Sequence, residues 1–420
     1  GIALVLLCGI VLYYFSRMKL SLAPLTITVD FFQVLGRQAS IAIPWGSGTS
    51  AALRWSALLD FDLELMAPEC VINVDFTTTW LAVNVMPLAG IVVLAVFHFG
   101  RGRRGNRTGW LDLSEARIRT FLSSVMLLCQ LVYMVLVVKA LAALDCVSIP
   151  GGRQVLESSS SIVCWESKEH MPLMIGGAVA VLVYAIGIPL AFMWAMQRAR
   201  DPHRSQSSRA FWVAVTAPLS ARFRPSHTSW ILVIMVRKAL IAAGVILQST
   251  RPIMQLTLSI FVLAVALALQ MRHRPYDTMS KVLVEECGHA RLKGIVARAR
   301  RRVRSQGQTR APSTGDQISP TQGTAQAAAP SAWKQDTFVG VAARMADANV
   351  MEESSLLASI MVVAAGQMFL AADVSAQQNL GLPDWSLALL DAGVVCVTAG
   401  SGLYITIITI VAAWIVNHQR

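Results

Sequence analysis

The sequence carries few charges for its length, and this scarcity excludes an ordinary soluble domain. Only 14% of its 420 residues are charged and 55% are hydrophobic, whereas about a quarter of a soluble domain is charged. The net charge of +12 could suit nucleic acid, but the arginines stand mostly beside apolar runs, where they determine membrane topology. We therefore expect an all-α, polytopic helical membrane protein whose main partner is the lipid bilayer and not nucleic acid.

The sequence also lacks the short motifs of common catalytic and cofactor sites. It contains no Gly-rich phosphate loop, no His-Glu-x-x-His helix and no Gly-x-Ser-x-Gly elbow. Its seven histidines are scattered, and its seven cysteines form no Cys-x-x-Cys pair, which argues against a zinc or thioredoxin-type site. We expect neither an enzyme nor a bound cofactor or metal.

Apolar runs long enough to reach across the ~30 Å hydrocarbon core of a bilayer recur along the chain. Arginine clusters beside these runs mark their cytoplasmic ends. Together they predict about nine transmembrane helices, with the N-terminus outside and the C-terminus in the cytoplasm. The expected spans are Gly1–Phe15 (the tail of a span), Leu25–Trp45, Thr78–Phe99, Ile118–Leu144, Pro172–Met196, Ser229–Gln248, Met254–Met271, Ser355–Ala372 and Ser386–Val416.

The second of these spans is ambiguous. Leu25–Phe31 alternates apolar and polar residues with the period of a strand, and Asp30 is costly in lipid unless it faces protein. The segment could be a polar-faced span or could lie in the membrane interface. The Arg101–Arg107 cluster favours a span, because Thr78–Phe99 must then begin outside.

Composition divides the chain into three parts. Residues 1–296 form a membrane domain with the first seven spans and their external loops. Ala297–Lys334 is rich in small and polar residues and is expected to be a disordered basic cytoplasmic linker. Its head, Arg298–Arg304, is expected to contact anionic lipid. Residues 335–420 hold the last two spans.

Two further segments are expected outside the membrane. Ala51–Met66 is predicted to be an external segment that follows the membrane surface, and the alternation of apolar and polar residues over Leu59–Met66 argues against a helix there. Asp145–His170 is predicted to be an exposed loop. Only Cys70, Cys146 and Cys164 fall on the oxidising side, where disulfides form, and we expect the pair Cys146–Cys164.

Two neighbouring cations lie deep inside an expected span. Arg237 and Lys238 stand roughly eight residues into a helix, and adjacent residues point about 100° apart, so at least one must face protein. Candidate partners are Asp30 and Asp391. A gating or ion-coordinating role and a structural ion pair are equally favoured. Further polar candidates for a pore or gate are Gln33 and Gln255.

The order of features around this span resembles a known family. A basic residue before Pro225, then Trp230, the Arg237-Lys238 pair, and Arg274-Pro275-Tyr276 followed by an acidic residue at Glu285 recur in that order. This order resembles the C-terminal membrane region of large cysteine-rich surface proteins of algae and other protists, which is loosely similar to fungal transient-receptor-potential-like channels. In that resemblance Arg274, Pro275, Tyr276 and Glu285 suit a cytoplasmic gating linker, although a simple stop-transfer flank would look the same.

The resemblance implies a cation-permeable channel, gated mechanically or chemically, at the end of a surface protein whose ectodomain precedes residue 1. It implies inorganic cations and a homo-oligomer as partners, and a plasma or ciliary membrane as location. Two alternatives remain open from the residues. One is a membrane anchor or signalling receptor for an ectodomain, and the other is a lipid or solute transporter, although the chain lacks the inverted repeat of many transporters.

Overall fold

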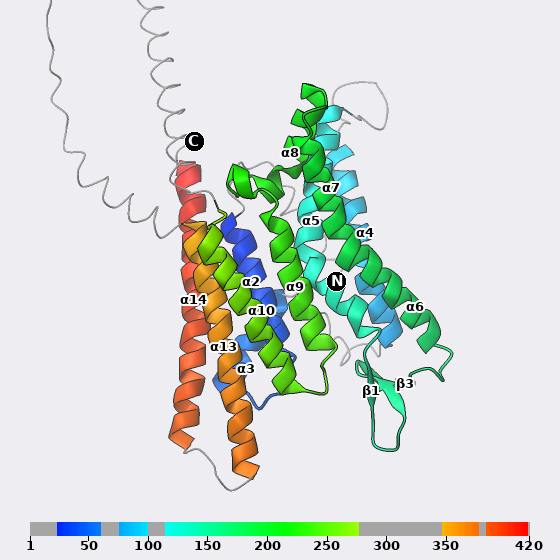
Figure 1. The fold of residues 1–420 in the computed structure, drawn as a ribbon, viewed down its shortest axis with the longest axis vertical. Helices are drawn as coiled ribbons and strands as arrows, with labels where there is room; N and C mark the ends of the chain where they lie inside the picture. Colours follow the sequence, from blue (N-terminus) through cyan, green and yellow to red (C-terminus); the bar gives the residue numbers. More distant parts are fainter. Residues whose placement is uncertain (1–22, 60–74, 100–113, 277–346, 378–383, 419–420) are drawn as a thin grey trace, which may run out of the picture.

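The computed structural model describes residues 23–59, 75–99, 114–276, 347–377 and 384–418 (Figure 1). These residues form a bundle of helices with one small antiparallel sheet, in which β1, β2 and β3 are neighbours in chain order. The elements are α2 Ala23–Ala39, α3 Ser47–Leu59, α4 Phe76–Phe99, α5 Glu115–Ala142, β1 Cys146–Ser148, β2 Gln154–Leu156, β3 Ser159–Val163, α6 His170–Ala180, η3 Val181–Gly187, α7 Ile188–Arg200, α8 Gln206–Ser220, η4 Pro225–His227, α9 Trp230–Ile246, α10 Pro252–His273, α13 Ala348–Gln377 and α14 Asp384–His418.

Six helical segments of the described part are long and apolar enough to cross a membrane, which confirms an all-α membrane protein. They correspond to six of the expected spans. The 17-residue helices α2 and α9 match two more but are only about 25 Å long. Gly1–Phe15 lies outside the described residues, so the count of nine crossings stays a prediction. The six segments are Phe76–Phe99, Glu115–Ala142, His170–Arg200, Pro252–His273, Ala348–Asp373 and Trp385–Tyr404.

The ambiguous second span is a helix, so the strand period at its start was misleading. The polar side chains of α2 recur at intervals of three or four residues and therefore share one helical face. That face is buried in the bundle, which explains how a polar helix sits among apolar ones. Its members are Thr26, Asp30, Gln33 and Arg37, all buried.

Two helices were not predicted. Residues 51–59 belong to α3, which ends at Leu59; the rest of Leu59–Met66, where alternation argued against a helix, lies outside the described residues. Helix α8 was not predicted either, because it is short and contains Pro218. Its N-terminus is capped by the Ser205 hydroxyl, which accepts a hydrogen bond from the Ser208 N–H at 3.4 Å.

A proline sets the shape of the longest kinked segment, α6–η3–α7. Pro189 has no N–H, so the carbonyl of Ala185 loses its helical donor, and the backbone before Pro189 adopts the π-helix η3. The Tyr133 hydroxyl of α5 donates to this carbonyl at 3.1 Å. On α6, a Cβ at Gly177 would lie 2.8 Å from that of Ala143, so a glycine is needed for α5 and α6 to approach.

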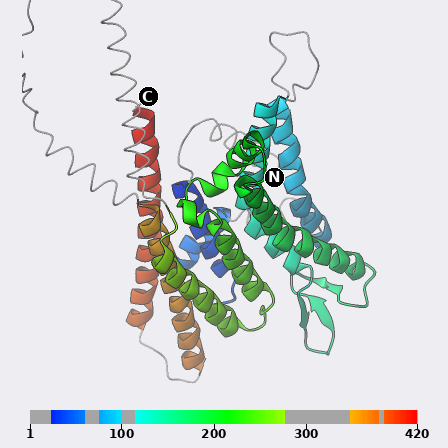
Figure 2. The same ribbon diagram turned by 45° about the horizontal axis from the view of Figure 1, so that its top comes forward.

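The helices form two groups that meet at α5, α9 and α2 (Figures 1 and 2). In one group α10 packs on α9 and α13, and α13 packs on α2 and α14; in the other, α5 packs on α4, α6 and α8. A Cβ at Gly402 of α14 would lie 3.1 Å from the ring of Phe32, whereas a Cβ at Gly393 or Gly400 would meet no neighbouring atom of the described residues within 4 Å.

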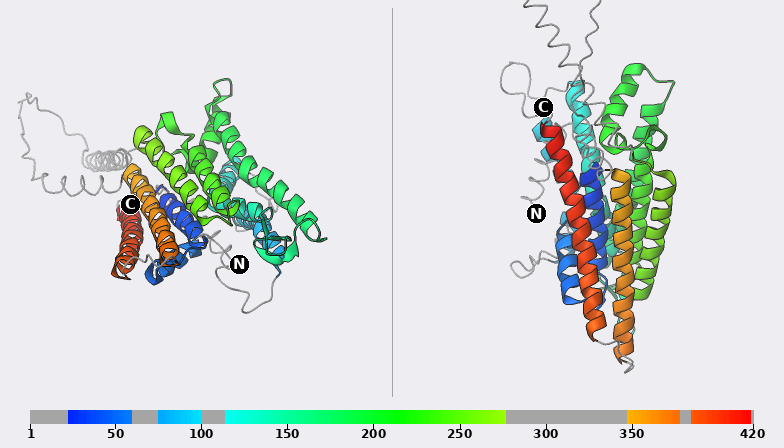
Figure 3. Two further views of the ribbon diagram at one scale, coloured as in Figure 1. Left: turned by 60° about the horizontal axis from the view of Figure 1, so that its bottom comes forward. Right: turned by 90° about the vertical axis from the view of Figure 1, so that its left-hand side faces the viewer.

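The two ends of the bundle differ in chemistry. The sheet lies at one end and α8 at the other, together with the end of α7, the start of α9 and the end of α10 (Figures 1 and 3). We call them the sheet end and the α8 end. Arginines gather at the α8 end: Arg198 and Arg200 of α7, Arg209 of α8, Arg222 and Arg224 after it, and Arg272 and Arg274 at the end of α10.

This asymmetry gives a test of orientation, since arginine-rich ends face the cytoplasm. Single cysteines are placed at Ser158 in the β2–β3 turn and at Ser207 of α8, both exposed, with serine at the native cysteines other than Cys146 and Cys164. An impermeant maleimide on intact cells should label position 158 and should label position 207 only after permeabilisation. Labelling of position 207 on intact cells would show that the α8 end faces outside, opposite to the predicted orientation.

Candidate functional site: a buried charge network

The two adjacent cations of α9 each bind a carboxylate from a different helix. The Arg237 Nη1 atom lies 2.6 Å from Glu352 Oε1 of α13, and the Lys238 Nζ atom lies 2.5 Å from Asp30 Oδ1 of α2. All four side chains are at most 8% exposed. Because neighbouring residues of a helix point about 100° apart, one turn of α9 joins two helices that are distant in sequence.

An amide extends this network to a fourth helix. Gln33 of α2 accepts a hydrogen bond from Lys238 Nζ at 2.7 Å and donates through Nε2 to the Leu131 carbonyl of α5 at 2.8 Å. The predicted residues Arg237, Lys238, Asp30 and Gln33 therefore belong to one site. Each charge is compensated, and loss of one partner from such a buried pair costs about 3–5 kcal/mol.

Glu352 is the member of the site that the sequence did not reveal. It stands in the first turn and a half of α13 and three residues before Ser355, where the expected span began. An acidic residue at that place looks like part of the polar sequence that flanks a transmembrane span. The signal that could have found it is that two buried cations need two carboxylates within reach, and Asp30 can supply only one of them.

The other candidate partner, Asp391, is elsewhere. Its carboxylate accepts hydrogen bonds from the backbone N–H groups of Gly48 at 3.0 Å and Thr49 at 2.8 Å. These are unpaired donors of the first turn of α3, which attract a negative charge. A Cβ at Gly46 would overlap this carboxylate. Asp391 of α14 thus caps α3 and does not compensate Arg237 or Lys238, which corrects the expectation.

Gln255 also lies apart from the ion pairs. It is in the first turn of α10 and donates through Nε2 to the Val245 carbonyl at the end of α9, at 2.5 Å. It therefore fastens the α9–α10 hairpin near its turn, toward the sheet end. Of the candidates for a pore or gate, Gln255 and Asp391 are the two that the structure does not bring to the charge network.

The foot of α10, residues Arg274, Pro275 and Tyr276, is held by the start of α13. The Asn349 side chain accepts from the Tyr276 N–H at 3.1 Å and donates to the Tyr276 carbonyl at 3.0 Å. Arg274 Nε lies 3.6 Å from Glu353 Oε1, and the Pro275 carbonyl accepts from the Arg224 N–H at 2.8 Å. Specific contacts therefore hold this segment, and it is more than a simple stop-transfer flank. We call residues Arg274, Pro275 and Tyr276 with their partners the joint. Glu285 lies outside the described residues.

Tyr276 is the centre of this joint. Its ring packs on Phe223 with centroids 4.9 Å apart, and it is only 1% exposed. Burial, together with the nearby negative charge of Glu352, raises the pKa of the Tyr276 phenol well above its usual range. The phenol therefore stays neutral at physiological pH and contributes packing to the joint.

The foot and the ion pair are parts of one helical turn. Asn349 and Glu353 hold the foot, and Glu352 between them in sequence binds Arg237. A rotation or shift of the first turn of α13 must therefore change both contacts together. Polar side chains continue along the buried faces of α10 and α13, where the described residues include Ser259, Gln270, Ser355 and Ser359.

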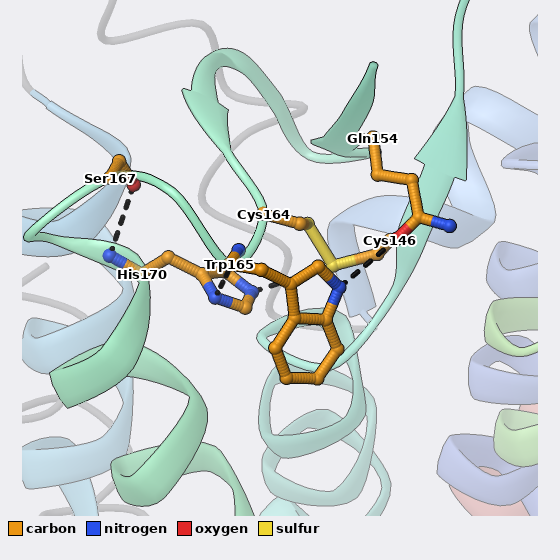
Figure 4. The surroundings of a disulfide bond; sticks show 6 residues. All are labelled: Cys146, Gln154, Cys164, Trp165, Ser167 and His170. Carbon is orange, nitrogen blue, oxygen red and sulfur yellow. Dashed lines mark hydrogen bonds between the residues drawn. A yellow bond between two sulfur atoms is a disulfide. The ribbon is translucent and has the colours of Figure 1, made fainter. Parts of the chain in front are cut away.

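At the sheet end, Cys146 and Cys164 are joined by a disulfide with their Cα atoms 6.4 Å apart (Figure 4). This is the pair that the topology predicted; Cys70 lies outside the described residues. The bond closes the loop between α5 and α6 and fixes the sheet on the bundle. His170, the first residue of α6, points its ring at the same sulfur atoms.

Fold and site together define the class: a helical membrane protein whose bundle is crosslinked by two buried ion pairs at one level and closed by a disulfide at one end. No family model, curated protein or solved structure matches the chain.

The pairing predicts which variants compensate each other. Arg237→Gln leaves Glu352 buried and unpaired and should lower the free energy of unfolding by about 3–5 kcal/mol. Adding Glu352→Gln should restore part of this, about 1–3 kcal/mol of coupling in a double-mutant cycle. The measurement is thermal unfolding in detergent with Arg237→Gln/Asp391→Asn as the matched control, which should show no coupling. Coupling to Asp391 and not to Glu352 would contradict the network.

Proposed function

We propose that this chain is a cation-permeable channel of the transient-receptor-potential-like kind, gated mechanically or chemically, with the α8 end in the cytoplasm. The observation that carries the proposal is the pair of carboxylates, Asp30 and Glu352, buried inside a membrane-crossing bundle and engaged by neighbouring residues of one helix. Ionisable groups inside a membrane are costly and usually serve ion pathways or their gates.

Polar groups on either side of the ion pairs support a pathway. The buried face of α2 carries Thr26 and Gln33 as well as Asp30, and that of α13 carries Ser355 and Ser359 in the turns after Glu352. Hydroxyl, amide and carboxylate oxygens are the groups that replace water around a permeating cation. Glu352 Oε2 and Arg237 Nε are buried and have no hydrogen-bond partner among the residues that the structure describes, so both atoms could form further hydrogen bonds.

The joint at the foot of α10 supports a gate. Because Asn349 and Glu353 hold the foot in the same turn of α13 that presents Glu352, a pull on the foot is transmitted to the Arg237–Glu352 pair over a few residues. A switch of this kind needs an element with two arrangements whose equilibrium a stimulus can bias. In the proposed channel, the closed arrangement keeps the pair engaged.

A membrane anchor or signalling receptor is the second candidate. The observation that favours it is the pairing itself, since each of the two cations of α9 has its own carboxylate, as in a structural crosslink. In that case the α2–α9–α13 network only fixes helix packing, and the disulfide-bonded sheet connects the bundle to an ectodomain.

Recordings from purified protein in a planar bilayer test the proposal. Wild-type protein should pass a cation-selective current under tension, voltage or agonist. The charge-neutral double variant Arg237→Gln/Glu352→Gln should fold but show an altered reversal potential or open probability, because fixed charges act on ions at close range. Asp391→Asn, which removes a carboxylate that caps α3, is the control and should leave selectivity unchanged.

Two outcomes decide against a channel. If wild-type protein carries no current under all three stimuli while monodisperse and folded, conduction is excluded. If, in addition, Arg237→Gln only lowers stability, the network is structural and the anchor candidate is favoured.

A further inference from the structure

We propose that Cys146, Cys164 and His170 form a thiol-exchange site, in which His170 stabilises the Cys146 thiolate so that low-molecular-weight thiols can open the disulfide and the disulfide forms of those thiols can close it again. The inference concerns the sheet end and does not depend on ion conduction. It rests on which nitrogen of the His170 ring faces the disulfide and carries the proton.

The ring of His170 has its proton on the nitrogen that faces the disulfide. The backbone N–H of Trp165 lies 3.2 Å from Nδ1, and an N–H can only donate, so Nδ1 accepts. In a neutral imidazole the other nitrogen then carries the proton. That nitrogen, Nε2, lies 3.4 Å from Cys146 Sγ and donates to it.

The backbone around the site is arranged to maintain this direction (Figure 4). Trp165 has φ of 69°, a left-handed conformation that is uncommon for a bulky residue. This conformation aims its N–H at His170, and its indole N–H donates to Gln154 at 3.0 Å. Such conformations cluster at functional sites. Ser167 accepts from the His170 N–H at 3.2 Å and fixes the start of α6.

The same geometry argues against a metal site. The sulfur atoms of Cys146 and Cys164 and a ring nitrogen of His170 lie within 4.8 Å of one another, as metal ligands would. A metal needs the lone pair of Nε2, and a ligating histidine normally donates its other N–H to an acceptor. Here Nδ1 faces a donor. The ring is therefore set to donate a proton toward sulfur.

A hydrogen-bond donor beside a cysteine favours its thiolate and so favours the reduced state of the pair. Cys146 is also the more exposed of the two cysteines, because Cys164 is only 3% exposed while Cys146 is partly exposed. Cys146 is therefore both the sulfur that a thiolate attacks and the thiolate that His170 stabilises after reduction.

Reduction by a dithiol proceeds in two exchanges. A reductant thiolate attacks Cys146 Sγ, the Cys146–Cys164 bond breaks, and Cys164 leaves and takes up a proton. The second reductant thiolate attacks its own partner sulfur in the mixed disulfide and expels Cys146 as a thiolate, which His170 Nε2–H stabilises. The reductant loses two electrons and forms its own disulfide; the pair gains them as one thiol and one thiolate, and the remaining proton goes to water.

The test is a redox titration of the purified full chain with reduced and oxidised dithiothreitol. Free thiols are tagged with a maleimide and Cys146 is read by peptide mass spectrometry. His170→Leu should make the disulfide about tenfold harder to reduce, or ~30 mV for a two-electron couple. His170→Gln, which retains an N–H, should stay nearer to wild type. Ser160→Ala, at an exposed position of β3, is the control and should not shift the midpoint.

A second readout separates stabilisation of the thiolate from a purely structural role of His170. In Cys164→Ser, Cys146 is a lone thiol, and its rate of alkylation by iodoacetamide near neutral pH follows its thiolate fraction. Adding His170→Leu should lower this rate several-fold. Equal midpoints and equal alkylation rates with and without His170 would overturn the proposal. So would zinc binding by the reduced wild-type protein that is lost in His170→Leu, because Nε2 would then be a ligand.

Discussion

The bundle depends on one constraint: two adjacent cations on α9 must each have a carboxylate inside an apolar environment. Isolated burial of either charge is costly, so α2 must bring Asp30 to Lys238 and α13 must bring Glu352 to Arg237. The second pair spans 115 residues of sequence. It therefore fixes the place of α13 in the bundle. Gln33 adds α5 to the same level, so three helices are positioned around one turn of α9.

The two ends of the bundle are secured by different chemistry. At the sheet end the connection between α5 and α6 is covalent, through Cys146 and Cys164. At the α8 end the foot of α10 is held by the hydrogen bonds of Asn349 and by an Arg274–Glu353 contact with an exposed arginine. Surface ion pairs of that kind contribute about 0–1 kcal/mol. Conformational change is therefore less costly at the α8 end. It can reach the Arg237–Glu352 pair, because Glu352 is three residues from Asn349 and one residue from Glu353.

The sequence was sufficient for the six apolar spans of the described residues and for every member of the charge network except Glu352. Apolar length and flanking arginines identify the membrane helices, and the cost of burying Arg237 and Lys238 requires carboxylates, of which Asp30 was identified correctly. Asp391 was assigned wrongly because the start of α3, whose N–H groups at Gly48 and Thr49 it caps, was not predicted. Glu352 was missed because an acid in the first turns of a helix has the pattern of a flank. The alternation at Leu25–Phe31 suggested a strand because a short segment of an amphipathic helix can alternate by chance; the spacing of Asp30, Gln33 and Arg37 is the helical signal.

The engaged Arg237–Glu352 pair also constrains how a channel built on this bundle would open. While Arg237 and Glu352 are engaged, the carboxylate is neutralised by its partner and offers little to a cation. Separating such a pair costs about 3–5 kcal/mol if nothing replaces it, which at about 1.4 kcal/mol per tenfold corresponds to an open population of about one in a hundred to one in several thousand. Hydration or a cation at Glu352 lowers that cost, and tension on the foot of α10 acts on the same turn. A stimulus therefore needs to supply only a few kcal/mol at Asn349 and Glu353 to change the state of Glu352, which places the sensitive step of such a channel in the first turn of α13.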